Sequence, residues 1–132
     1  MSEDKKIENN AEVTTPVIDD NELAVAEREA EKSANIYTHK FATPFKCEDK
    51  VYDELTFDWG ALKGKDCLSI ENEMASLGIP LITPEFSGEF LIRMAAHACT
   101  EKIGHDVLRE MPLGDYNKVR GRARSFLMRS GR

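Results

Sequence analysis

The sequence predicts an α+β, helix-dominant fold: an N-terminal β-hairpin followed by three to four packed α-helices, all preceded by a disordered acidic tail. Three observations lead to this prediction. Acidic residues are concentrated at the start of the chain, a β-type pattern follows, and after residue 60 the apolar positions recur at helical spacing. Strands followed by a run of helices are typical of an α+β arrangement, and 132 residues fit one domain.

Residues 1–35 form the predicted tail, and residues 36–132 form the predicted domain. The tail holds ten acidic and four basic residues, a net charge of −6, and the rest of the chain sums to zero. The tail has no Phe, Trp, Tyr or Cys. It therefore buries too little apolar surface to offset the entropy of ordering, about 1–2 kcal/mol per residue. Because residues 22–34 are rich in Ala and Glu, a transient or partner-induced helix is the alternative there.

Two segments rich in aromatic and β-branched residues, 36–45 and 51–57, are the predicted strands. The polar connection 46–50 has the length of a hairpin loop. Pro44 cannot donate a ladder hydrogen bond, which favours an edge position for the first strand. A two-stranded sheet of this size is difficult to cover on both faces, so part of the aromatic surface is expected to remain for a partner.

The next two predicted helices are bounded by capping and breaking residues. Asp66 is the expected N-cap of the first, and Gly78 is its stop signal. Thr83 is the expected N-cap of the second, which runs from Pro84 to Cys99. The apolar residues of the first helix are Cys67, Ile70, Met74 and Leu77. Those of the second are Phe86, Phe90, Leu91, Met94, Ala95 and Ala98.

A short helix over residues 106–110 and a longer last helix complete the predicted domain. Asp115 is the expected cap of the last helix. Its apolar positions are Tyr116, Val119, Ala123, Phe126 and Leu127. Its basic positions are Lys118, Arg120, Arg122, Arg124 and Arg129.

The sequence lacks the spacing patterns of catalytic and ligand-binding sites, so neither an enzyme nor a cofactor or metal site is expected. His39, His97 and His105 form no metal-binding motif with one another or with the cysteines. There is no nucleophile elbow and no glycine-rich phosphate loop. The odd number of cysteines fits a reducing cytoplasm. No apolar run long enough for a signal peptide or a membrane span is present, so a membrane partner is not expected.

The basic last helix has two open interpretations. Arg120, Arg122 and Arg124 could form an electrostatic patch for nucleic acid or an acidic partner. They could equally be a solvated face near a helix C-terminus, neutralised by the acidic tail. Because the domain sums to zero charge, nucleic acid is not the expected ligand. The tail then has two interpretations as well, a solubility device or a mask for this helix.

The order of short motifs over residues 38–128 resembles a known family. The motifs are YDELTFD at 52–58, LKGKD at 62–66, IENE at 70–73, EFLIRMAA at 89–96, LGDYNKV at 113–119 and Phe126-Leu127. This order is similar to that of the tail assembly chaperones of P2-like and Mu-like long-tailed phages. The family is called the E type, or the 41 or 14 type. The acidic tail lies outside the resemblance.

The resemblance implies a role in virion morphogenesis, for a phage, a prophage or a phage-tail-like particle. Such chaperones bind the tape measure protein, keep it soluble and help to recruit tail tube subunits in the host cytoplasm. They are absent from the finished particle. The implied partners are the tape measure protein first, then the tail tube protein, the chain itself, and a longer form made by ribosomal frameshifting.

The hypothesis for partner binding is a groove between the helix at 84–99 and the helix at 115–128. The expected partner-binding residues are Phe86, Phe90, Leu91, Met94, Tyr116, Val119, Phe126 and Leu127. Two alternatives stay open: a small DNA-associated regulator that uses the basic last helix, and a structural component of the tail.

Overall fold

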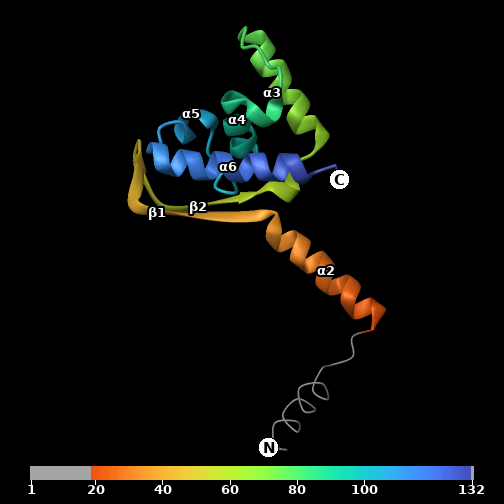
Figure 1. Cartoon of the computed structure of the whole chain (residues 1–132). Helices are drawn as coiled ribbons and strands as arrows, with labels where there is room; N and C mark the ends of the chain where they lie inside the picture. Colours follow the sequence, from red (N-terminus) through yellow and green to blue (C-terminus); the bar gives the residue numbers. More distant parts are fainter. Residues whose placement is uncertain (1–18, 132) are drawn as a thin grey trace, which may run out of the picture. The chain divides into compact units, whose positions relative to one another are not determined.

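The computed structural model describes residues 19–131, and the chain divides into two units, residues 1–31 and 32–132 (Figure 1). The elements in order are α2 (Asp20–Ala34), β1 (Ile36–Cys47), β2 (Lys50–Asp58), the 3₁₀ turn η1 (Trp59–Ala61), α3 (Gly64–Ser76), the 3₁₀ turn η2 (Pro84–Phe86), α4 (Gly88–Ala98), α5 (His105–Leu108) and α6 (Leu113–Arg129). A β-hairpin followed by helices confirms the predicted α+β fold.

Helix α2 begins in the acidic segment that was expected to be disordered. Asp19 caps it, since its Oδ1 atom accepts a hydrogen bond of 2.7 Å from the backbone N–H of Glu22. For residues 22–34 the structure agrees with the alternative to disorder, a helix favoured by the Ala- and Glu-rich composition, and this helix begins two residues earlier, at Asp20. Residues 1–18 of the expected tail lie outside the described residues.

The hairpin turns more tightly than the sequence suggested. Cys47 pairs with Lys50, so the turn consists of Glu48 and Asp49, with Glu48 at a left-handed φ of 56°. The ladder is interrupted after Lys40 and resumes at Phe45, which leaves residues 41–44 opposite a single residue of β2. Pro44 lies in this bulge, where its missing N–H interrupts no ladder bond.

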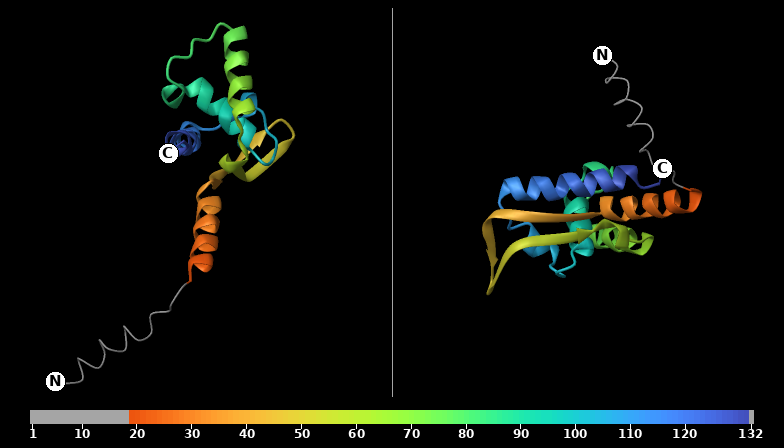
Figure 2. Two further views of the ribbon diagram at one scale, coloured as in Figure 1. Left: turned by 90° about the vertical axis from the view of Figure 1, so that its right-hand side faces the viewer. Right: turned by 90° about the horizontal axis from the view of Figure 1, so that it is seen from below.

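The two faces of the hairpin differ in burial, and the helices cover one of them (Figure 2). Inward side chains are His39, Phe41, Phe45, Leu55 and Phe57, and all are buried. Thr38, Lys40 and Glu54 on the other face are exposed. The free edge of β2 is partly paired, because the N–H of Thr100 donates to the carbonyl of Thr56 at 2.8 Å. The aromatic side chains of the sheet thus belong to the core rather than to an open face.

Helix α4 is the central element of the core. Seven of its eleven residues are buried, because α3, α6 and β2 pack around it. The largest fully buried side chains come from every layer: Trp59, Phe57, Phe90, Leu55, Ile70, Met74, Leu91, Met94, Leu108, His39 and Val119.

Three helix starts differ from the predictions. α3 begins at Gly64, and Asp66 lies within its first turn, where its carboxylate accepts from the N–H of Lys63 at 2.7 Å. The predicted helix 84–99 is two elements, because Ser87 caps α4 by accepting from the N–H of Phe90 at 3.1 Å. α6 begins at Leu113, so Asp115 is in its first turn and not its cap. In α3 and α6 the acidic residue predicted as the cap is the third residue of the first turn, so each helix begins two residues before its predicted cap.

Alanine substitutions at two glycines are expected to change the stability of the domain in opposite directions. Gly78 follows α3 at a φ of +73°, which L-residues rarely adopt. Gly121 lies inside α6, and a Cβ there would meet nothing within 4 Å. Gly121→Ala should therefore raise the free energy of unfolding by about 0.5–1 kcal/mol, and Gly78→Ala should lower it by about 1 kcal/mol. Urea unfolding measures both; equal signs for the two variants would contradict the assignment.

Candidate functional site

Half of the predicted partner-binding side chains lie in the core. Phe90, Leu91, Met94 and Val119 are at most 1% exposed. They are not on the surface of the folded domain, because α4 and α6 pack directly against each other along these faces. Their assignment to a surface groove is corrected. Tyr116, Phe126 and Leu127 are partly buried at the edge of the core.

Phe86 differs from the other members of that set because its side chain is 71% exposed. Leu113, which is not among the predicted partner-binding residues, is equally exposed at 71%. Its position ahead of the presumed cap of the last helix placed it outside the helical pattern. Both residues lie beside the starts of α4 and α6.

A depression of about 380 Å³ lies between α4 and α6, at their first turns rather than along their length. Its lining residues are Gly88, Glu89, Ile92, Arg109, Met111, Leu113 and Tyr116. A Cβ at Gly88 would lie 3.0 Å from the hydroxyl oxygen of Tyr116. Glycine at this position therefore lets the tyrosine ring lie close to the start of α4.

The three arginines of the predicted patch lie on two sides of α6. Successive residues two apart are about 200° apart on a helix, so Arg120 and Arg124 share one side and Arg122 lies on the other. Each guanidinium lies over an aromatic ring. The distances from CZ to ring centroid are 5.4 Å for Arg120 over Tyr116, 5.6 Å for Arg124 over Phe86 and 4.5 Å for Arg122 over Tyr37. The prediction of a single basic patch is therefore wrong.

The arginines of α6 differ from Arg93 and Arg109 in that they have no carboxylate partner among the described residues. Among the described residues, no carboxylate forms an ion pair with Arg120, Arg122, Arg124 or Arg129. Arg124 donates from Nε to the carbonyl of Glu85 at 2.9 Å, and the Nε atom of Arg120 is buried without a hydrogen-bond partner. The cationic groups of α6 thus keep hydrogen-bonding capacity that aromatic stacking does not use.

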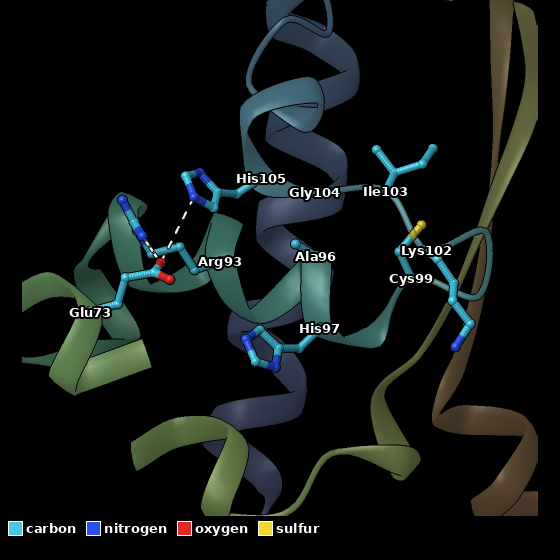
Figure 3. Close-up of a pocket in the computed structure, with 9 residues that line it drawn as sticks. All are labelled: Glu73, Arg93, Ala96, His97, Cys99, Lys102, Ile103, Gly104 and His105. Carbon is cyan, nitrogen blue, oxygen red and sulfur yellow. Dashed lines mark hydrogen bonds and ion pairs between the residues drawn. The ribbon is translucent and has the colours of Figure 1, made fainter. Parts of the chain in front are cut away.

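A second depression, of about 370 Å³, lies beside an ion-pair cluster (Figure 3). Arg93 is only 4% exposed and donates to Glu73 and Glu89. In Figure 3 the Glu73 carboxylate lies between Arg93 and His105. Arg109 donates twice to Glu89, at 2.9 and 3.1 Å. The cluster joins α3, α4 and α5, which is a structural role for these charges.

This cluster predicts an acid dependence of stability. The hydrogen bond from Arg109 holds the pKa of Glu89 below its usual value. A lowered folded-state pKa stabilises the protein above the unfolded pKa of about 4.3, and the contribution is lost as pH falls through the folded-state value. Glu89→Gln should lower the free energy of unfolding at pH 7 by about 1–2 kcal/mol and flatten its decline below pH 5.

The control for Glu89 is Glu71→Gln, because Glu71 is an exposed acid on α3. Urea midpoints between pH 3 and pH 7 measure both variants. An unchanged slope in Glu89→Gln would show that this carboxylate does not carry the acid dependence.

A buried hydrogen-bond chain joins β1 to α6. His39, 2% exposed, contacts Asp115 Oδ1 through Nε2 at 2.7 Å and the Tyr37 hydroxyl through Nδ1 at 2.8 Å. Burial, with Asp115 adding to it and Arg122 opposing it, raises the pKa of the Tyr37 hydroxyl. That hydroxyl is therefore held protonated, and the chain fixes the hairpin against α6. The sequence carries a signal for this buried histidine, because His39 alternates with Tyr37 and Phe41 on one face of the strand.

Within residues 19–131, no group of three or more His, Cys, Asp or Glu side chains is arranged to hold a metal ion. The cysteines Cys47, Cys67 and Cys99 are all free thiols. In the same part of the chain, no helix has both the length and the apolar character that crossing a membrane requires.

Comparison of the chain with protein-family models, with curated proteins and with solved structures finds no match. The candidate site therefore rests on the geometry of the domain: the depression at the starts of α4 and α6, and the exposed residues around it.

Proposed function

We propose that this protein is a phage tail assembly chaperone that binds the tape measure protein and keeps it soluble while tail tube subunits assemble around it. The observation that carries the proposal is the exposure of two large apolar side chains: Leu113, which lines the depression at the starts of α4 and α6, and Phe86, on the 3₁₀ turn just before α4. The domain has a complete core of its own, so these side chains are not needed to build it. Large apolar side chains left beside a depression are typical of a binding surface.

The motif order supports the proposal in a specific way, because several of its residues build the domain. Leu55 and Phe57 of the YDELTFD motif are core residues of β2. Asp115 of the LGDYNKV motif holds His39. A chain that shares these motifs would share the scaffold, and the binding surface lies at one end of it.

A holding chaperone needs apolar contact, reversible affinity and solubility. An exposed phenylalanine and leucine on a small surface give limited burial, which fits reversible binding. The net charge of −6 keeps copies of the chain apart by repulsion. The protein would act in the host cytoplasm and leave before the particle is finished. Tail tube protein and a longer frameshifted form of the chain are further proposed partners.

Co-expression with the tape measure protein of the same genome tests the proposal. The full chain should move the tape measure protein from the pellet to the soluble fraction and elute with it. A Phe86→Ala/Leu113→Ala variant should lose this effect, whereas Val51→Ala, an exposed apolar residue of the hairpin, should keep it. An insoluble tape measure protein with no complex would refute the proposal, and so would finding this chain in purified particles.

A further inference from the structure

We propose that one surface of the domain binds an amphipathic helix whose apolar residues are flanked by carboxylates. The surface, here called the Phe86–Leu113 surface, consists of Phe86, Leu113, Tyr116, Arg120 and Arg124. The inference rests on the proposed function, in which the bound helix is a segment of the tape measure protein, and it adds the charge and shape of that segment.

The residues of the Phe86–Leu113 surface are continuous along one side of α6. Four of them follow one another along α6 at spacings of three, four and four positions, which places them in one row: Leu113, Tyr116, Arg120 and Arg124. Arg120 lies over the ring of Tyr116, and Arg124 lies over the ring of Phe86. The row therefore extends from the depression at the start of α6 to the exposed phenylalanine of η2.

The arginines of this row are arranged to bind carboxylates. A guanidinium that stacks on an aromatic ring is fixed in orientation before the partner arrives, and stacking leaves its terminal N–H groups able to donate hydrogen bonds. Elsewhere in the domain, Arg93 and Arg109 have glutamate partners, whereas Arg120 and Arg124 have none among the described residues. The Nε of Arg124 donates to the carbonyl of Glu85 and the Nε of Arg120 is buried, so the Nη groups of the two arginines are the donors left for a partner. Charge complementarity thus points to acidic groups on the bound molecule.

The spacing of the apolar residues favours a helix as the occupant. Leu113 and Arg124 are eleven residues apart on α6, about 16 Å along the helix axis. This is about three turns of a partner helix. Such a helix could place one apolar side chain in the depression lined by Ile92 and Met111 and another against Phe86. Its acidic residues would then lie beside the arginines.

The same features argue against nucleic acid as the occupant. Arg122 lies on the opposite side of α6, so the basic residues do not form one continuous track for a phosphate backbone. Exposed Phe86 and Leu113 interrupt the charge on this side. The domain itself sums to zero charge, and the −6 of the acidic segment 1–35 adds repulsion of a long polyanion.

The experiment uses the full chain and two labelled 18-residue helical peptides with the same leucine positions. One peptide carries Glu beside the leucines, and the other carries Lys. Fluorescence anisotropy should show binding of the Glu peptide and no binding of the Lys peptide. Arg120→Gln/Arg124→Gln and Phe86→Ala should each weaken binding of the Glu peptide by about tenfold. Lys118→Gln/Arg129→Gln, with the same charge change elsewhere on α6, should change it less than about twofold.

Several results would overturn the inference. They are equal binding of both peptides, equal loss in the control pair, and salt-sensitive binding of a DNA duplex that Arg120→Gln/Arg124→Gln abolishes. Self-association that depends on the same pair would instead make a second copy the occupant. Thermal unfolding checks that each variant is folded.

Co-expression separates this inference from the proposed function. If the Arg120→Gln/Arg124→Gln chain still keeps the tape measure protein soluble, the inference fails and the proposed function stands. If the Glu peptide binds as expected but the wild-type chain does not hold the tape measure protein, the surface is right and the proposed function fails.

Discussion

Replacing Phe90 by alanine is expected to destabilise the domain by about 3–5 kcal/mol, a large part of the 5–15 kcal/mol by which a small domain is stable. Phe90 is 1% exposed on the central helix α4, and its removal leaves a cavity between α4 and its neighbours. Urea unfolding followed by the fluorescence of Trp59, a buried tryptophan stacked on Phe57, measures the loss.

Phe86→Ala is the matched control, since it removes the same side chain from a position that is 71% exposed. Its expected effect on stability is below about 1 kcal/mol, which includes the stacking of Arg124 on the ring. The pair separates core from surface: Phe90 should affect folding, and Phe86 should affect binding. Similar losses of stability in both variants would contradict the proposed division.

The second large effect is expected at the pair that joins β1 to α6. Asp115→Ala should lower the free energy of unfolding by about 1–3 kcal/mol, because it leaves the buried Nε2 of His39 without its partner. Asn117→Ala, at an exposed position of the same helix, should change stability by less than about 0.5 kcal/mol.

A double variant tests whether the loss comes from an unpaired polar group. His39→Phe/Asp115→Ala removes both partners and places an apolar ring beside Phe41, whose ring centroid lies 4.8 Å from that of His39. It should recover part of the loss seen in Asp115→Ala. Losses that simply add would show that the two residues contribute separately.

Local patterns predicted the elements well because each depends on nearby residues. The helical spacing of Ile70 and Met74 identified α3, and both residues are buried. Gly78 was correctly predicted as its stop, since its positive φ suits glycine. The polar loop between two β-type segments identified the hairpin. These signals act over a few positions and need no tertiary information.

The candidate site could not be predicted in the same way. Periodicity shows that Phe90 and Val119 lie on apolar helix faces, but not whether those faces meet each other or a partner. Phe86 was assigned to the same face, although the break at Ser87 places it in a separate turn with a different environment. Leu113 lies outside the predicted helix because Asp115 has the side chain of a typical cap, whereas α6 begins two residues earlier.

The arginines of α6 show a second reason why the candidate site is harder to predict from the sequence than the helices and strands. A count of basic residues near the C-terminus gives charge but no direction, so Arg120, Arg122 and Arg124 were grouped together. Their helical angles separate them, and the rings over which they lie come from η2, β1 and α6 itself. Contacts between residues 37 and 122, or 86 and 124, leave no signal in a single sequence.

Site-specific photo-crosslinking tests the central claim most directly. A photoreactive residue is placed at position 86, at position 113, or at position 38, where Thr38 faces outward on the far side of the hairpin. Each full-length chain is co-expressed with the tape measure protein. Crosslinks to the tape measure protein from positions 86 and 113, and none from position 38, are the predicted result. Crosslinks from position 38 alone, or from none of the three, would contradict the account.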